Sequence, residues 1–334
     1  MFKRLSTMAV LMGLLFCGTA SAAEITIKAA HNTGAGCEQS VPFAVFKDYV
    51  EKASNGRIEV VIYENSSMGG CLETLEKAQM NIIQLAFGSS SNLSSVVPEL
   101  EVLELPYLCE KPEENMKLFY NKDGKLDGPV YQRLEDEFEK LGVKIVLISP
   151  YSPRALGMNS KCQTMKDIKG KKLRSTASRI ERDVISAMGA SPATISFAEC
   201  YTALQLKTID GIGLNYSTIL ISKFYENLKS LIFVPYNGFF MIASMNKAFY
   251  EGLPDWAKPI VDAGLDKALQ EANKQWVTIM NDSVATMEKE GILCHTPTAD
   301  EMKEWRAAAQ PVYDEYSAIV DQDFLKLVKE RLGK

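Results

Sequence analysis

Strand-like and helix-like segments alternate along this chain in units of roughly 30 residues, a spacing typical of connected β-α-β units. The strand patterns lie at residues 24–31, 57–63 and 82–88, and a helical pattern at 38–53 separates the first two. Neighbouring parallel strands need a long connection between them, usually a helix. The alternation therefore predicts an α/β fold built on mostly parallel sheets.

A second set of alternating segments follows the strand pattern at 143–150. It has strand patterns at 171–175, 193–197 and 208–214, separated by helical patterns at about 179–188 and 198–206. From Pro254 to about Glu290, apolar residues keep helical spacing over a length that is unusual within one domain. We expect two α/β domains, joined by crossing strands and spanned by this long helix.

The first 22 residues have the pattern of a secretory signal peptide. Lys3 and Arg4 form a basic start, residues 8–17 are apolar, and residues 20–22 fit a small-residue cleavage site. The apolar run is shorter than the about 20 residues of a membrane-spanning helix. Cys17 lacks the small preceding residue that lipoprotein processing needs, so we expect export without lipidation.

Charge and motif content argue against several functional classes. The 334 residues carry a net charge of −5 and no basic block, so no nucleic-acid partner is expected. The histidines are His31 and His295, neither in HExxH spacing, and no CxxC pair exists, so no metal site is expected. No phosphate loop, dinucleotide fingerprint or nucleophile elbow is present, so we expect no cofactor and no enzyme activity. Cys200 lacks a nearby histidine and is expected to be a buried cysteine.

Residues 189–211, GASPATISFAECYTALQLKTIDG, resemble a segment of the solute-binding proteins of tripartite ATP-independent periplasmic (TRAP) transporters, of the dicarboxylate-binding type. Similar matches follow the chain in order and cover nearly all of it after the signal peptide. They are NSSMGG (65–70), VPELEVLELPYL (97–108), DIKGKKLRS (167–175), KFYE (223–226) and AAAQPVYDEY (307–316).

The resemblance implies a two-lobed periplasmic-binding-protein (Venus flytrap) fold. Lobe 1 would comprise residues 23–151 and about 240–280, and lobe 2 residues 152–239 and about 281–334. An organic acid would bind in the cleft, and the lobes would close around it by hinge motion. The implied partner is the TRAP membrane permease, and the chain is expected to be monomeric. A secreted ligand-binding enzyme and a binding protein that serves a sensor remain the alternatives.

The resemblance also assigns site residues. An arginine at the end of the GxKxR strand, here Arg174, would face the cleft and hold the ligand carboxylate. The planar guanidinium offers two parallel donors that match a carboxylate. Arg154 corresponds to a second arginine that assists, with a structural salt bridge as the alternative. The further ligand-binding residues implied by the cleft loops and by the F-x-E motif are His31, Asn32, Ser89, Ser90 and Phe197.

Two of these assignments have structural alternatives, and the resemblance adds a disulfide. His31 can equally be a capped residue at a strand end, and packing alone would explain Phe197. Cys37 and Cys71 follow the first and second strands, which are neighbours in the family topology. The resemblance therefore predicts a Cys37–Cys71 disulfide at the rim of the cleft.

The chain departs from the resemblance at one binding position. Many carboxylate binders have the pattern D-G-x-x-N, whereas this chain has Leu214 at the asparagine position and Asn215 one residue later. One residue of offset turns a strand side chain to the opposite face. Either Asn215 reaches the site through a bulge, or the pocket is more apolar there. We therefore favour a monocarboxylate or substituted organic acid over a succinate-like diacid. The candidate stacking surfaces are Phe197, Tyr216, Phe239 and Phe240.

Overall fold

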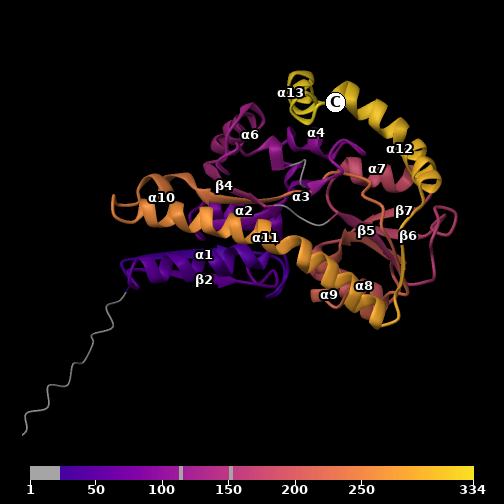
Figure 1. Ribbon diagram of the computed structural model, residues 1–334, viewed down its shortest axis with the longest axis horizontal. Helices are drawn as coiled ribbons and strands as arrows, with labels where there is room; N and C mark the ends of the chain where they lie inside the picture. The colour runs from indigo at the N-terminus through magenta and orange to yellow at the C-terminus, as the bar shows by residue number, and fades with distance from the viewer. Residues whose placement is uncertain (1–22, 113–115, 150–152) are drawn as a thin grey trace, which may run out of the picture.

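The computed structural model describes residues 23–112, 116–149 and 153–334. The predicted signal peptide lies outside these residues, and so does the predicted boundary between the lobes at 151–152. Two separate sheets form the centres of two lobes, side by side along the long axis of the molecule (Figure 1). The predicted two-lobed α/β fold is confirmed.

The lobe 1 sheet contains five strands in the order β2-β1-β3-β10-β4. Strand β1 pairs in parallel with β2 and β3, whereas β10 is antiparallel to both β3 and β4. Strand β10 is reached from lobe 2, so it enters this sheet in the opposite direction. The strands are β1 (Ile25–Ala30), β2 (Ile58–Tyr63), β3 (Leu85–Ser89), β4 (Val143–Ser149) and β10 (Met241–Asn246).

The lobe 2 sheet contains six strands in the order β11-β9-β5-β8-β6-β7. Strand β6 is parallel to β7 and β8, and β5, which is reached from lobe 1, is antiparallel to β8 and β9. Each sheet is therefore mostly parallel, as predicted, and contains one antiparallel strand, β10 in lobe 1 and β5 in lobe 2, that follows a crossing between the lobes. The strands are β5 (Arg154–Met158), β6 (Lys172–Ser175), β7 (Ser191–Thr194), β8 (Gly211–Asn215), β9 (Ser230–Ile232) and β11 (Leu293–His295).

Helix α11 (Lys258–Lys289) confirms the predicted long helix and spans both lobes (Figure 1). Its 32 residues extend over about 48 Å at 1.5 Å per residue. The N-terminal half packs on α1 (Ser40–Ala53) of lobe 1, and the C-terminal half reaches α9 (Tyr216–Ile221) of lobe 2. The contact with α1 depends on Gly264, because a Cβ there would lie 2.6 Å from Val50.

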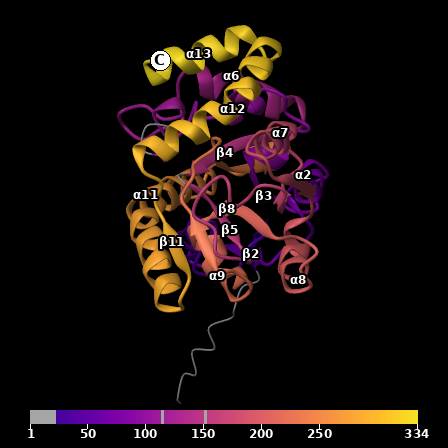
Figure 2. The ribbon, with the colours of Figure 1, turned by 90° about the vertical axis from the view of Figure 1, so that its right-hand side faces the viewer.

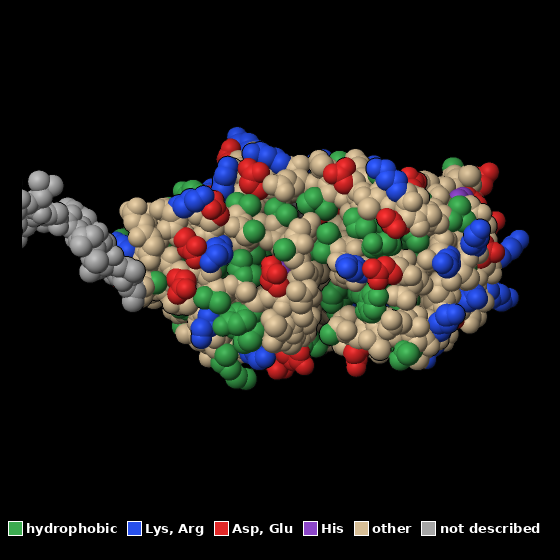
Figure 3. Space-filling model, turned by 90° about the horizontal axis from the view of Figure 1, so that it is seen from below, with side chains coloured by type: hydrophobic (Ala, Val, Ile, Leu, Met, Phe, Trp, Pro, Cys, Tyr) green, Lys and Arg blue, Asp and Glu red, His purple; other side chains and the backbone are tan. Residues whose placement is uncertain are grey.

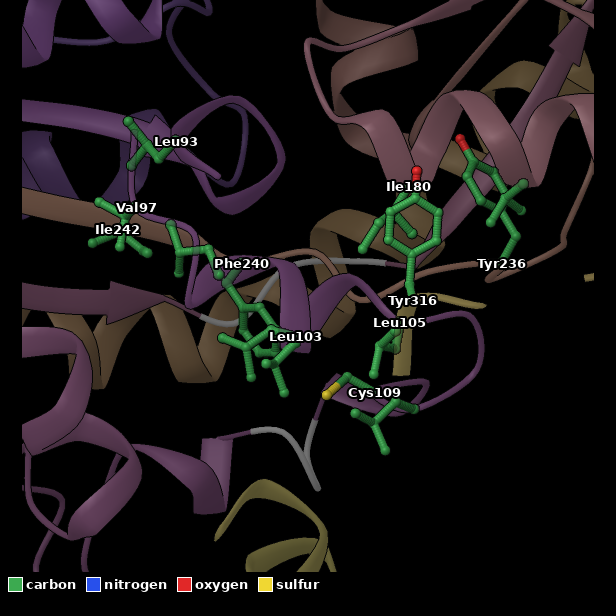
Figure 4. Close-up of a cluster of buried hydrophobic side chains, with 14 of the residues drawn as sticks. Leu93, Val97, Leu103, Leu105, Cys109, Ile180, Tyr236, Phe240, Ile242 and Tyr316 are labelled. Carbon is green, nitrogen blue, oxygen red and sulfur yellow. The ribbon is translucent and has the colours of Figure 1, made fainter. Parts of the chain in front are cut away.

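Two C-terminal helices, α12 (Ala299–Ile319) and α13 (Gln322–Leu332), lie together over α6 (Pro129–Lys140) and α7 (Arg179–Ala187) (Figure 2). A capping box of Thr298 and Glu301 begins α12. Helix α12 packs on α7 and α13 packs on α6 and α4, so the C-terminal segment contacts elements on both sides of the cleft. Figure 4 shows part of the buried cluster beneath these helices, which includes Leu103, Ile180 and Tyr316.

Shorter helices complete both lobes. In the described part of the chain, no helix combines the length and apolar composition that crossing a membrane requires. In lobe 1 the α-helices are α2 (Cys71–Gln79), α3 (Ser90–Leu93), α4 (Leu100–Glu104), α6 (Pro129–Lys140) and α10 (Lys247–Glu251), with a 3-10 helix, η1 (Met116–Leu118). In lobe 2 they are α7 (Arg179–Ala187) and α8 (Cys200–Gln205), with 3-10 helices η2 (Phe197–Glu199) and η3 (Phe224–Asn227).

Candidate functional site

Two adjoining cavities lie between the lobes. The inner cavity measures about 30 Å³ and the outer cavity about 420 Å³, and side chains from both sheets and their following loops line them. They share four lining residues, Asn32, Cys71, Asn92 and Phe197, which makes them one continuous cleft. Figure 3 shows one long face of the molecule, with hydrophobic side chains near its middle and charged side chains on both halves.

Arg174 lines the inner cavity and has the features expected of an anion-binding residue. Strand β6 ends at Ser175, so Arg174 stands at the carboxyl end of a parallel strand pair. The side chain is buried, and its Nε donates to the carbonyl oxygen of Ile195 at 3.1 Å. Its Nη1 is buried without a hydrogen-bond partner among the described residues. A buried guanidinium with an unused donor is costly unless an anion completes the site.

Arg154 is placed differently, in a buried ion pair that does not line either cavity. Its Nη1 lies 2.7 Å from Glu181 Oε1 and also donates to the carbonyl oxygen of Gly213 at 2.9 Å. Its Nη2 donates to Ser91 Oγ of lobe 1 at 3.0 Å. Tyr236 adds a hydroxyl that donates to the same Glu181 oxygen at 3.0 Å. The structure thus shows the salt bridge that the sequence left open as the alternative. Arg174 makes no ion pair with Glu181, although, against the effect of burial, the charges of Arg154 and Arg174 both act to lower the pKa of Glu181.

A second buried carboxylate, Glu104, lies beside this ion pair. Burial raises the pKa of Glu104 to about 8, the Ser178 hydroxyl that donates to it lowers the value, and the charge of Glu181 raises it further. The guanidinium of Arg154 acts in the lowering direction. Glu104 belongs to lobe 1 and Ser178 to lobe 2. A buried polar network, which includes the carboxyl group of Glu104 with its raised pKa, therefore joins the lobes.

The raised pKa of Glu104 predicts a pH-dependent stability. The folded protein keeps a proton on Glu104 that the unfolded chain releases above its ordinary pKa near 4.5. This group therefore makes the free energy of unfolding fall as pH rises from about 4.5 to about 8. Glu104→Gln should remove this contribution, so that the variant gains stability relative to the wild type as pH rises. Urea unfolding of both proteins across this range measures the difference, and a constant difference would contradict the prediction.

Comparing the two proteins is necessary because His31 acts in the opposite direction. Burial lowers the pKa of His31 to about 4, so its contribution makes stability rise between about 4 and its ordinary 6.5. The contribution of His31 is common to the wild type and the Glu104→Gln variant. It therefore cancels in the difference between their unfolding free energies.

The loop after β1 presents one of its two predicted residues to the cleft. Asn32 lines both cavities, and its Oδ1 is buried with no hydrogen-bond partner in the described part of the chain. His31 is buried against the ring of Phe43, 5.2 Å between centroids, and lines neither cavity. His31 is therefore a strand-end residue packed into lobe 1, and Asn32 is the residue of this pair that can contact a ligand.

The loop after β3 also presents one of its two predicted residues to the cleft, Ser89. Ser89 ends the strand, lines the inner cavity and accepts a hydrogen bond from Asn92 Nδ2 at 2.8 Å. Ser90 is fully buried, and its Oγ accepts from the backbone N–H of Phe240 at 3.1 Å. Ser90 thus fixes β10 against this loop and does not line either cavity.

Leu214 and Asn215 both line the inner cavity, without a bulge in the β5–β8 pairing. Strand β8 ends at Asn215 and α9 begins at Tyr216, so the alternation of strand side chains stops at this point. Asn215 Nδ2 donates to Glu38 Oε2 at 3.2 Å and to Ser217 Oγ at 3.0 Å. The site therefore contains both the apolar side chain of Leu214 and the polar side chain of Asn215. The sequence had suggested either an Asn215 that enters through a bulge or a more apolar pocket.

Phe197 is the one of the four proposed aromatic surfaces that lines the cavities. It contacts Phe224 edge to face, with centroids 5.5 Å apart. Tyr216 packs on Phe233, Phe240 packs on Phe119, and Phe239 lies 4.4 Å from the guanidinium carbon of Arg154. The last three therefore stabilise the walls around the cleft.

The sequence missed several residues of the inner cavity. Asn92 and Thr176 follow the ends of β3 and β6, so the rule that selected Ser89 would also have selected them. Gln39 precedes α1 and gave no local signal of its role. Thr218 and Met241 enter through the packing of α9 and β10. The missed lining residues are Gln39, Asn92, Thr176, Thr218 and Met241.

The predicted Cys37–Cys71 disulfide is wrong, because both thiols are free. Cys37 is buried within lobe 1, where its Sγ lies 2.7 Å from Thr33 Oγ1. Cys71 begins α2 and faces the cleft, where it lines both cavities. The two cysteines follow neighbouring strands, but the side chain of Cys37 lies inside lobe 1 and that of Cys71 lies at the cleft.

Other parts of the described chain offer weaker sites. A cavity of about 270 Å³ in lobe 1 is lined by charged side chains that are already paired, such as Lys125 with Asp266 and Lys144 with Glu135. Tyr250, which also lines it, donates its hydroxyl to Asp262 at 2.7 Å. The described residues contain no cluster of histidine, cysteine and acidic side chains that could hold a metal ion. The interlobe cleft is therefore the candidate site.

Comparisons with known proteins agree with this geometry. Curated relatives include the C4-dicarboxylate-binding periplasmic protein DctP of Rhodobacter capsulatus, 26% identical over an alignment of 322 residues that covers 93% of this chain and 92% of the relative. The sialic acid-binding periplasmic protein SiaP of Vibrio cholerae is 24% identical over 302 residues, covering 90% of this chain and 91% of the relative.

Solved structures show the same fold. A TRAP periplasmic solute-binding protein from Sulfurospirillum deleyianum, with bound succinate, has a TM-score of 0.84 and 26% identity over 92% of this chain and 99% of its own. The sugar acid binding protein DctPAm of Advenella mimigardefordensis, in complex with galactonate, has a TM-score of 0.87 and 20% identity, covering 93% and 99%. At that identity the second comparison shows the fold alone.

The family assignment rests on the sequence profile of the bacterial extracellular solute-binding proteins, family 7 (DctP), which matches residues 29–319. The match covers most of the chain and includes both lobes. The relatives are solute-binding proteins rather than enzymes. The chain belongs to this family, and it is a DctP-type solute-binding protein of the kind that serves TRAP transporters.

Proposed function

We propose that this protein captures an organic acid in the interlobe cleft and delivers it to a TRAP permease in the membrane. The observation that carries the proposal is Arg174, a buried guanidinium that lines the inner cavity with an unused Nη1 donor. Among the described residues, the charge of Arg174 acts on Glu181, but Glu181 makes its ion pair with Arg154. A ligand carboxylate would supply both the missing charge and the missing acceptor.

The names of the relatives support the same class of ligand. The Rhodobacter capsulatus relative is named for C4-dicarboxylates, and the Sulfurospirillum deleyianum structure contains succinate. We also propose that residues 1–22 direct export, that the mature chain acts in the periplasm, and that it does so as a monomer. Sequencing the N-terminus of the periplasmic protein and measuring its mass in solution test these points.

Thermal shift against a panel of organic acids, followed by calorimetry, tests the proposed ligand class. A ligand present at 100 times its dissociation constant should add about 2.7 kcal/mol to the free energy of unfolding. If none of the acids shifts the melting temperature while a neutral or cationic solute does, the proposal fails. Recovery of the bound acid unchanged excludes turnover, and uptake by reconstituted permease separates transport from service to a sensor.

A further inference from the structure

The described lining of the inner cavity contains two buried polar atoms of opposite kind that have no hydrogen-bond partner among the described residues. Arg174 Nη1 is a donor, and Asn32 Oδ1 is an acceptor. The two residues are 2% and 7% exposed, so bulk water does not satisfy these atoms. Each buried atom that lacks a partner destabilises the empty site, and a ligand that satisfies both atoms removes that cost.

One carboxylate cannot satisfy both atoms, because an ionised carboxylate only accepts hydrogen bonds. It can accept from Arg174 Nη1, but Asn32 Oδ1 needs a donor such as a hydroxyl or an ammonium group. No acidic side chain is among the described residues that line the inner cavity, so an ammonium group would lack a counter-charge there. A hydroxyl group is therefore the donor that this cavity favours.

The size of the inner cavity places that hydroxyl close to the carboxylate. About 30 Å³ has room for a carboxylate and little more. Asn32 also lines the outer cavity of about 420 Å³, so it stands where a ligand would pass from one cavity to the other. A hydroxyl on carbon 2 or carbon 3 of the acid would be at this position, and the remainder of the ligand would occupy the outer cavity.

The charges of the outer cavity disfavour a second carboxylate. Of the described residues that line the two cavities, Arg174 is the only cation. Glu73 adds a carboxylate to the lining of the outer cavity. The distal carboxylate of a diacid would therefore meet no cation and would be repelled by Glu73.

We infer that the ligand is a monocarboxylate with a hydroxyl group on carbon 2 or 3, selected by Asn32 as the acceptor of that hydroxyl. This inference rests on the proposed function, because it takes the contact of the carboxylate with Arg174 as its starting point. It assigns a specificity-determining role to Asn32, whereas Arg174 provides affinity for any carboxylate.

Calorimetry with acids that differ by one hydroxyl group tests the inference. The pairs are butyrate with 2- and 3-hydroxybutyrate, each enantiomer measured separately, and hexanoate with 2-hydroxyhexanoate; succinate is the diacid. At least one hydroxy acid should bind about 10- to 100-fold more tightly than its parent, the range expected for one buried unsatisfied acceptor. Equal binding within every pair, or tightest binding by succinate, would overturn the inference.

Variants identify the residue that reads the hydroxyl group. Asn32→Leu keeps a similar size and removes the acceptor, so the ratio of affinities within a pair should fall to about 1, and Asn32→Ala provides a second test if the leucine variant does not fold. Asn281→Leu is the matched control, because it makes the same substitution at an exposed asparagine of α11 that lines neither cavity. It should keep the ratio of the wild type.

Arg174→Ala separates this inference from the proposed function. It should weaken the binding of both members of a pair by the same factor. If Arg174→Ala has no effect, the proposed function fails. If it weakens both acids while Asn32→Leu leaves their ratio unchanged, or lowers both affinities equally, the role of Asn32 as hydroxyl acceptor is wrong and the proposed function stands.

Discussion

Replacement of Arg174 by alanine is expected to weaken binding of the organic acid by about 2–5 kcal/mol and to leave the chain folded. The large effect follows from burial, since the carboxylate would lose its charge partner in a site that water does not reach. The fold should tolerate the change, because the hydrogen bond that Arg174 makes within the described chain is the one to the backbone of Ile195. Calorimetry on a variant with wild-type circular dichroism measures the loss.

Two further substitutions on β6 sharpen this expectation. Arg174→Lys should also lose most of the affinity, because an ammonium group keeps the charge but not the pair of parallel donors. Lys172→Ala is the matched control, since Lys172 is an exposed cation on the same strand and should bind ligand normally when replaced. Unchanged affinity in a folded Arg174→Ala variant would remove Arg174 from the site.

Local pattern was sufficient to predict strands β1, β2, β3, β4, β6 and β8 and helices α1, α7, α8 and α11. The apolar spacing from Pro254 to Glu290 predicted a helix that the structure shows from Lys258 to Lys289. The capping box of Thr298 and Glu301 at the start of α12 is a signal of the same local kind, because it depends on residues three positions apart. Such signals are contained within a few turns of chain and need no knowledge of the tertiary fold.

The orientation of side chains at strand ends could not be predicted in this way. Ser89 and Ser90 are identical neighbours, yet Ser89 lines the cleft and Ser90 bonds the backbone of Phe240 from another part of the chain. Leu214 and Asn215 should have pointed to opposite faces, but the strand ends there and both reach the cavity. At these positions the next element, rather than the two-residue period, sets the direction.

The sequence also does not show which of the two arginines, Arg154 or Arg174, forms an ion pair within the protein. The sequence gives Arg154 and Arg174 the same chemistry and the same position near a strand end. The difference arises from Glu181, which the fold brings against Arg154 at 2.7 Å. Glu181 lies on α7 and approaches β5 through the packing of lobe 2, so only the tertiary structure shows which arginine is already neutralised.

Replacement of Glu181 by glutamine should therefore reduce the free energy of unfolding by about 3–5 kcal/mol, the usual cost of leaving one buried charge unpaired. Arg154 and Glu181 are both fully buried, and the nearby carboxyl of Glu104 has a raised pKa, so no other charged group in this network replaces Glu181 directly. Urea unfolding measures the loss. Lys303→Ala, which breaks an exposed ion pair with Asp300, should leave stability nearly unchanged and serves as the control.

The double variant Arg154→Met/Glu181→Leu distinguishes a structural ion pair from a ligand contact. Removing both charges leaves neither unpaired, so much of the stability lost in Glu181→Gln should return. If Arg154 acts only through Glu181, the folded double variant should bind the organic acid with nearly the affinity of the wild type. A large loss of affinity would mean that lobe closure or the ligand itself needs this guanidinium. The buried pair would then belong to the binding mechanism as well as to the fold.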